Sequence, residues 1–246
     1  MAGSSENSTF DNGTYIEGSR ITSTGSGTIS IKGSGGNGSG GNQGGVLIWS
    51  EAAITAAGSG DIEVVGTGGN SSGNGNHGIY LRDDGTAIQT ETGNISLIGR
   101  GHGTGTSENS KGIVVGNLLT ITAKQTGSTS LVGSGGSGTG NSNDGVVIWS
   151  GAMVTTGSGE LEVIGVGGGS GASEKNDGID IAGALVSTAS GPLRLSGTGG
   201  LTTGKKNRGV KVSNGATVTS ATGDVSVNGT GGDTDASANN HGVHLS

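Results

Sequence analysis

Three aromatic residues are the first candidates for ligand binding. Trp49 and Trp149 occupy equivalent positions in two similar segments, and Tyr80 lies in a third segment of the same kind. Exposed aromatic rings stack on the apolar faces of sugar rings, and tryptophan is enriched at binding hot spots. These residues are therefore the candidate ligand-binding face, with carbohydrate as the expected ligand. The alternative interpretation is that the rings cover apolar surface beside them.

Three aspartates form a second candidate group. Asp144 and Asp177 each directly precede a glycine at matching positions, and Asp180 follows Asp177 by three residues. Hard oxygen ligands suit calcium, so a calcium ion between these side chains is a candidate metal site. Lys111 and Arg208 occupy the same position as Asp144 and Asp177 in other segments, which favours a charge ladder instead. No other cofactor is expected, because the chain has no cysteine and its histidines lack ligand spacing.

Catalysis requires acidic and basic groups that converge. Glu63 and Glu162 occupy equivalent positions three repeats apart, about 14 Å if repeats stack like strands. Glycosidases keep their two carboxyls roughly 5 to 9.5 Å apart. A polysaccharide-degrading enzyme is therefore the least favoured function. Arg194, one repeat beyond Glu162, is expected to form a ladder ion pair with it.

A repeat along almost the whole chain must position these residues. A marker glycine returns every 31 to 34 residues, and from the second copy onward Val or Ile follows it. The marker glycines are Gly13, Gly45, Gly78, Gly112, Gly145, Gly178, Gly209 and Gly242. A fixed period of this length predicts a solenoid, in which each repeat buries apolar residues against its neighbours.

Each repeat contains three short segments of alternating apolar and polar residues, which predict strands with one buried face. In the second repeat these are residues 46–49, 52–56 and 62–64. Apolar residues recur in the same columns, so each strand should pair in parallel with its own copy one turn away. The predicted fold is an all-β, right-handed parallel β-helix of about seven coils, each with three strands and a Gly-rich loop. A seven-bladed propeller is the rival arrangement, but blades need longer repeats.

Glycine and asparagine columns mark the corners of the predicted coil. Glycines flank every third strand, at Gly60 and Gly66 for example, which indicates either positive φ or close backbone approach. A polar column ends each loop, and we expect its asparagines to form a hydrogen-bonded ladder along the axis. Ordinary turn asparagines are the alternative. The predicted ladder residues are Asn76, Asn143, Asn176, Asn207 and Asn240.

Charge and composition exclude several classes of partner. The 246 residues carry a formal net charge of −7, which argues against nucleic acid and anionic membrane surfaces. No apolar run approaches the roughly 18 residues of a membrane span, and residues 1–7 lack the regions of a signal peptide. We expect residues 1–12 to form a polar extension or partial cap. Residues 13–246 should form one repeat domain, a fragment of a longer array whose open ends can associate end to end.

The repeats resemble a known class of bacterial proteins. Glycine-punctuated runs such as Gly145-Val146-Val147-Ile148, followed by residues 157–163, are similar to those of secreted β-helix adhesins of the filamentous-haemagglutinin and autotransporter-passenger type. The resemblance covers about residues 13–246 and implies a non-catalytic stalk or adhesin repeat, extracellular or at the cell surface. Expected partners are a polysaccharide or the surface of a host or neighbouring cell. The alternative function is a carbohydrate-binding solenoid that uses the Trp49, Tyr80 and Trp149 face.

Overall fold

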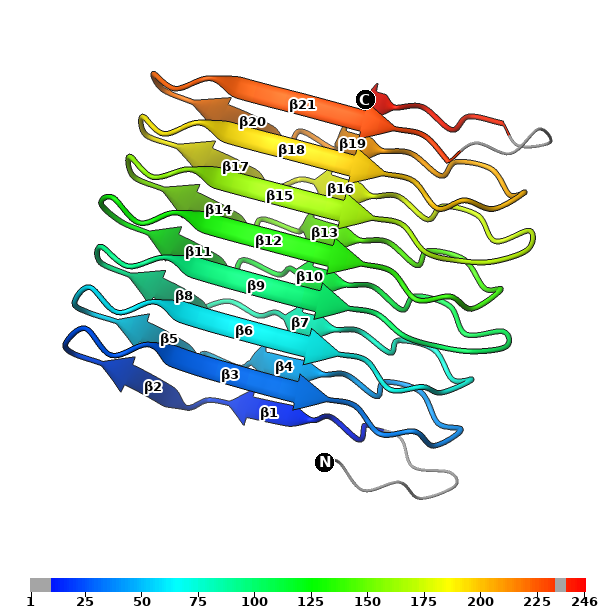
Figure 1. Ribbon diagram of the computed structural model, residues 1–246, viewed down its shortest axis with the longest axis horizontal. Helices are drawn as coiled ribbons and strands as arrows, with labels where there is room; N and C mark the ends of the chain where they lie inside the picture. Colours follow the sequence, from blue (N-terminus) through cyan, green and yellow to red (C-terminus); the bar gives the residue numbers. More distant parts are fainter. Residues whose placement is uncertain (1–9, 233–237) are drawn as a thin grey trace.

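The chain forms a parallel β-solenoid of about seven coils, as predicted (Figure 1). This computed structural model describes residues 10–232 and 238–246. In Figure 1 the third strand of each coil runs from left to right in front, while the first two run back behind it and the chain climbs. That path is right-handed. Every strand pair among these residues is parallel, which excludes the antiparallel blades of a propeller.

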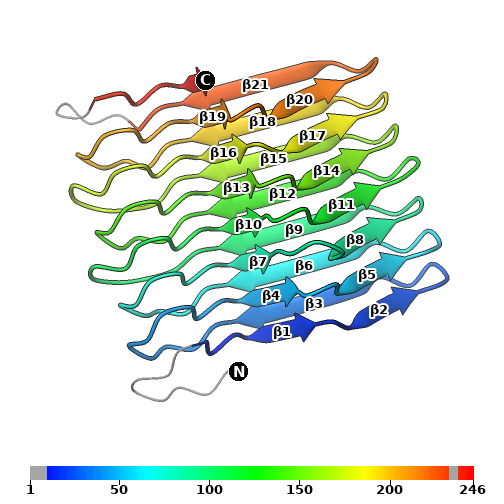
Figure 2. The ribbon, with the colours of Figure 1, turned by 180° about the vertical axis from the view of Figure 1, so that it is seen from behind.

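Three sheets run along the solenoid, and each takes one strand from every coil (Figures 1 and 2). The first sheet consists of β1 (Thr14–Glu17), β4 (Val46–Trp49), β7 (Ile79–Leu81), β10 (Ile113–Val115), β13 (Val146–Trp149), β16 (Ile179–Ala182), β19 (Val210–Ser213) and β22 (Val243–Leu245). The second consists of β2 (Arg20–Ser23), β5 (Ala53–Ala56), β8 (Ala87–Thr90), β11 (Thr120–Ala123), β14 (Met153–Thr156), β17 (Leu185–Thr188) and β20 (Thr217–Ser220). The third consists of β3 (Ile29–Ser34), β6 (Ile62–Thr67), β9 (Ile95–Arg100), β12 (Thr129–Ser134), β15 (Leu161–Val166), β18 (Leu193–Thr198) and β21 (Val225–Thr230).

The core is a stack of apolar columns in the register that the sequence predicts. Ile48 pairs with Leu81, and Leu81 lies one coil below Val115. All three side chains are fully buried. Because each coil contributes only a few Val, Ile and Leu side chains, burial depends on the coils above and below. Third strands are longer than expected: β6 continues to Thr67, so Gly66 lies inside the strand rather than at a corner.

The third and first sheets meet backbone to backbone in every coil, where the end of a third-sheet strand, such as β15, faces the start of the first-sheet strand that follows it, such as β16. We call this contact the neck. A Cβ on Gly165 would overlap the carbonyl oxygen of Gly178, and a Cβ on Gly178 would overlap the amide of Thr198. The same overlap recurs at the equivalent glycines of the other coils, and none of them has a positive φ. Close backbone approach therefore explains the two glycine columns that form this neck.

Positive φ angles occur at two other places in the coil. Four of the corners between first and second strands use two successive left-handed residues, such as Ser50 and Glu51 (φ 58° and 64°) or Asn117 and Leu118 (φ 56° and 63°). A second left-handed column immediately precedes the asparagine column. It comprises Asn42, Gly75, Asn109, Ser142, Lys175, Lys206 and Asn239. Non-glycine residues occupy most of these positions, so no residue type marks them in the sequence.

The N-terminal edge is only partly described. Of the predicted extension, residues 1–9 lie outside the described residues. Phe10 donates its amide to Gly41 O (3.3 Å), and Asn12 Oδ1 accepts from the amide of Gly44 (3.0 Å), so this segment continues the pattern of the coil above it. Among residues 10–232 and 238–246 there is no helix long and apolar enough to cross a membrane.

The neck predicts a sharp difference between two glycine-to-alanine substitutions. Gly165→Ala should lower the unfolding midpoint by roughly 4 °C or more, because its Cβ has no space against the Gly178 carbonyl. Gly25→Ala is the matched control, since nothing lies within 4 Å of its Cβ position and its φ is not positive. Thermal unfolding followed by circular dichroism measures both. Equal unfolding midpoints for the two variants would contradict the close backbone packing at the neck.

Candidate functional site

The predicted asparagines stack in one column together with Gln43 and Ser110. The backbone N–H of Asn143 donates to Asn176 Oδ1 (3.0 Å), and the backbone N–H of Asn176 donates to Asn207 Oδ1 (2.9 Å). The ladder thus joins backbone amides to side-chain oxygens of the next coil. Direct side-chain bonding, the arrangement we expected, occurs between Asn176 Nδ2 and Asn207 Oδ1 (2.9 Å). Backbone bonding predominates because these amides are buried and need an acceptor.

The carboxamide nitrogens of the column have a second role. Asn143 Nδ2 donates to Gly140 O (2.7 Å), and Asn207 Nδ2 donates to Gly204 O (3.0 Å), three residues back in the same loop. Each of these asparagines therefore ties its Gly-rich loop to the solenoid while capping the neighbouring coil. The column is structural: its side chains satisfy each other and the backbone, and are buried from solvent along most of its length.

The residue after the asparagine column forms a second, interrupted set of bonds of opposite sense. Asp144 Oδ1 accepts from the amide of Asp177 (2.8 Å), and Asp177 Oδ1 accepts from the amide of Arg208 (2.8 Å). In an earlier coil His77 Nδ1 accepts from the amide of Lys111 (3.2 Å). Here the acceptor lies in the preceding coil, because successive amides of an extended chain point in opposite directions along the axis.

The three aspartates proposed as calcium ligands are each paired with a basic side chain. Lys111 Nζ lies 3.4 Å from Asp144 Oδ2, Arg208 Nη1 lies 3.4 Å from Asp177 Oδ2, and Lys211 Nζ lies 3.0 Å from Asp180 Oδ2. No group of three acidic or imidazole side chains that could hold a metal ion occurs in the described part of the chain. The arrangement is a charge ladder, the alternative that the sequence favoured, and it gives the calcium hypothesis no support.

Burial perturbs two of these carboxyls. Loss of solvation, and then repulsion from the nearby Asp144 carboxylate, raise the pKa of Asp177 to about 7, against the opposing effect of Arg208. Burial likewise raises the pKa of Asp144 despite the ammonium of Lys111. These groups border a charged groove of about 330 Å³, which also contains Lys206 and Lys211. Its acids and bases largely neutralise one another.

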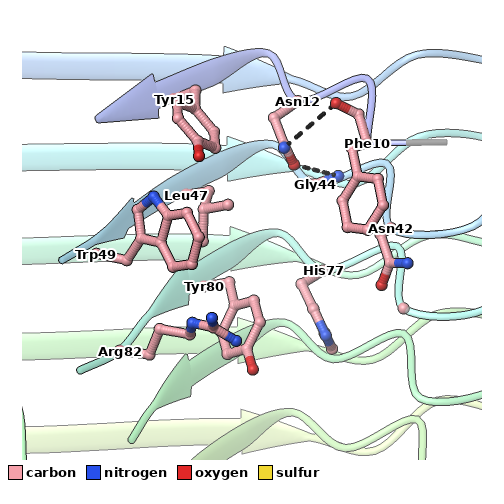
Figure 3. A pocket seen from close by; sticks show the side chains of 11 residues that line it. Phe10, Asn12, Tyr15, Asn42, Gly44, Leu47, Trp49, His77, Tyr80 and Arg82 are labelled. Carbon is pink, nitrogen blue, oxygen red and sulfur yellow. Dashed lines mark hydrogen bonds between the residues drawn. The ribbon is translucent and has the colours of Figure 1, made fainter. Parts of the chain in front are cut away.

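Trp49 and Tyr80 come together in a hollow of about 560 Å³ on the outer face of the first sheet (Figure 3). Tyr15 on β1 lies edge-on to Trp49 on β4, with ring centroids 6.0 Å apart. The guanidinium carbon of Arg82, just after β7, lies 4.6 Å from the Trp49 centroid and 5.6 Å from that of Tyr80. We call this hollow the aromatic pocket.

Trp149 does not belong to the aromatic pocket. It lies on β13, three coils from Trp49, and its side chain covers the backbone of the adjacent coil, where a Cβ on Gly116 would overlap the indole. It is 39% exposed. The predicted trio is therefore divided: two members share a pocket, and the third follows the alternative interpretation of a ring that covers neighbouring surface.

Several residues of the aromatic pocket were not predicted from the sequence. Tyr15, Phe10, His77 and Arg82 all border it. Tyr15 was detectable, because it stands in the same register row as Leu47 and Tyr80. Arg82 follows the strand and Phe10 precedes the repeat, so no column of the sequence pattern assigned them to this face.

The carboxylates considered for catalysis stay apart. Glu63 accepts a hydrogen bond from Ser30 Oγ (3.0 Å) and pairs with Lys32 (3.4 Å). We expected Arg194 to pair with Glu162. It pairs instead with Glu160, and Arg194 Nε lies 2.6 Å from Glu160 Oε1. Glu162 is its direct register neighbour, but the long arginine side chain reaches diagonally to the turn before β15.

Comparison with protein-family models, with curated proteins and with solved structures finds no match for this chain. The fold class, a parallel β-solenoid repeat protein, follows from the strand topology, and any function must be argued from the surface that the coils present.

The buried carboxyls predict a pH-dependent stability. Because the folded-state pKa of Asp177, about 7, lies above the unfolded value of about 3.9, the folded chain retains a proton that the unfolded chain loses between these pH values. The contribution of Asp177 to stability should therefore fall as the pH rises from about 4 to 7, whereas His77, whose pKa burial lowers to about 3, contributes in the opposite direction. Asp177→Asn keeps an oxygen for the Arg208 amide and should remove the Asp177 contribution, so its stability should fall less, or rise more, than that of the wild type over this range.

Thermal midpoints across this pH range measure the effect. Asp61→Asn is the matched control, because Asp61 Oδ1 also accepts a backbone amide of the next coil, that of Asn94 (2.7 Å), but at an exposed site. That control should retain the wild-type pH dependence. A midpoint that falls equally in wild type and Asp177→Asn would contradict the assignment.

Proposed function

We propose that this chain is a non-catalytic structural segment, a stalk or adhesin repeat, of a bacterial surface or secreted protein. The observation that carries the proposal is continuity: each sheet keeps one register across every coil, from β1 to β22 in the first. Enzymes interrupt a regular scaffold to bring reactive groups together, whereas a uniform stack is suited to length and display.

Physical properties of the stack agree with a role as a rigid spacer. Coils rise about 4.8 Å each, so seven coils extend about 34 Å. Parallel backbone pairing connects every coil to the next, the asparagine column adds a polar ladder, and the neighbouring column adds further bonds between some coils. A longer array of such coils would hold its faces away from a cell. The absence of cysteine and the resemblance to secreted adhesins favour an extracellular or cell-surface location. The expected partners remain a polysaccharide or another cell's surface, together with end-to-end association of open coils.

Carbohydrate binding is the second candidate function, and one observation favours it: Trp49 and Tyr80 lie in the same pocket. A polysaccharide-cleaving enzyme is the weakest candidate. Among the residues that the structure describes, no carboxyl lines the aromatic pocket. Glu63 on the third sheet is engaged with Lys32 and Ser30, and Glu160, just before β15, pairs with Arg194.

The location can be tested on intact cells of the organism that encodes the chain. An antibody raised against residues 13–246 should label unpermeabilised cells or the culture medium, and external protease should remove the cell-bound signal. A cytoplasmic protein of known location is the control. Labelling that appears only after permeabilisation would contradict a surface or secreted role.

The absence of catalysis is tested separately with bacterial, plant and host polysaccharides. Incubation with the purified chain should release no oligosaccharide detectable by chromatography, because no acid–base pair converges. Released products that disappear in Glu63→Gln or Glu162→Gln would overturn the structural proposal.

A further inference from the structure

We propose that the aromatic pocket is a binding site for a neutral sugar, taking one or two hexopyranose units of a polysaccharide against Trp49, Tyr80 and Tyr15. The inference deepens the second candidate function and is independent of the stalk role. It assigns the site to coils one to three and leaves Trp149 out of it.

The first argument is the shape and composition of the pocket. Its volume of about 560 Å³ is within the roughly 300 to 1,000 Å³ of small-ligand sites. Leu47 lies between Tyr15 and Tyr80 in the same register row, and Phe10 borders the hollow from the loop side (Figure 3). A pyranose ring presents an apolar C–H face and a rim of hydroxyls, so it needs apolar ring surface of this kind.

The second argument is that the rings are held in place before any ligand arrives. Arg82 contacts both Trp49 and Tyr80, and the Tyr15 hydroxyl donates to Glu17 Oε2 (3.0 Å). The His77 ring lies with its centroid 4.9 Å from that of Tyr80, tilted by 57°. Cation–π and aromatic contacts of this type fix side-chain rotamers, which reduces the entropy lost on binding.

Polar groups at the rim can meet sugar hydroxyls. The side chain of Asn42 borders the pocket (Figure 3) and makes no hydrogen bond to residues 10–232 or 238–246. Arg82 keeps further N–H donors beyond its ion pair with Asp83. A small number of convergent polar groups around an apolar surface is the usual composition of a site that fixes ligand orientation.

The charges favour an uncharged ligand. Among the described lining residues, Arg82 is the one basic side chain that carries charge, and Asp83 offsets it at 3.5 Å. His77 stays neutral, because burial and the charge of Lys111 lower its pKa to about 3. Glu17 lies beside Tyr15 at the edge and would repel an acidic sugar. Within the described part of the pocket, an acidic sugar would therefore find no unmatched cation.

The repeat itself supplies well-matched variants. Trp49→Ala introduces the residue that coil six has at this position, Ala182. Tyr80→Val introduces the residue of the next two coils, Val114 and Val147. Both should therefore fold with nearly unchanged thermal midpoints. Trp149→Ala is the control, and because the chain has only two tryptophans, it also leaves Trp49 as the sole indole reporter.

The test is titration of the purified chain with cellotetraose, maltotetraose and chitotetraose, with tetragalacturonate as the acidic comparison. Calorimetry should detect saturable binding of at least one neutral tetrasaccharide, and Trp49 fluorescence in the Trp149→Ala variant should change with the same affinity. Trp49→Ala and Tyr80→Val should each weaken binding by at least about tenfold, the effect of a truncated aromatic hot spot.

Three results would overturn the proposal: no saturable binding of any neutral tetrasaccharide, tighter binding of tetragalacturonate, or equal loss of affinity in Trp149→Ala and Trp49→Ala. If Trp49→Ala unfolds, Tyr80→Val alone decides, since it touches the pocket from a different strand. None of these results bears on surface labelling or on the absence of released products, so the stalk role fails or stands by its own tests.

Discussion

The solenoid depends on one steric constraint, the backbone contact at the neck of every coil. Gly165 and Gly178 leave no room for a Cβ on either side, and the same interlock repeats through the stack. It brings the first and third sheets together, closes the apolar core on the loop side and fixes where each first strand begins. A chain that is rich in glycine would otherwise lose too much entropy to fold. Here most glycine is placed where a side chain would prevent the fold.

The two polar ladders follow from that constraint. Beside the neck the chain leaves the regular sheet, and its buried amides still require acceptors. Side chains of the asparagine column accept from one direction, and side chains of the neighbouring column accept from the other. Asp144 and Asp177 fill the second role with charged oxygens. Lys111 and Arg208 partly offset the cost of burying them, and the pKa values of both carboxyls remain raised.

The outer face of the first sheet shows how a repetitive scaffold produces a singular site. Every coil offers outward positions there, and their side chains differ from coil to coil: valines on β10 and β13, for example, but Asp180 on β16 and Lys211 on β19. Only near the N-terminal end do Tyr15, Trp49 and Tyr80 occupy neighbouring coils, with Arg82 between two of the rings. Trp149 has the same place in its own coil but small neighbours, Ala182 and Gly116, so it packs over the backbone. The binding properties of this outer face therefore depend on which side chains become neighbours in adjacent coils.

The sequence alone determined the fold class, the register of the apolar columns and the position of the asparagine column, because each depends on a residue type that recurs at a fixed period. It could not choose between positive φ and close approach at the glycines, and it did not indicate the left-handed corners, where Glu51 and Leu118 are tolerated. Only the tertiary structure shows that Arg194 pairs with Glu160 and that basic side chains pair with the aspartates. It also separates Trp149 from the pocket that contains Trp49. Those outcomes depend on side-chain reach and on diagonal contacts between coils, which periodicity along the chain does not encode.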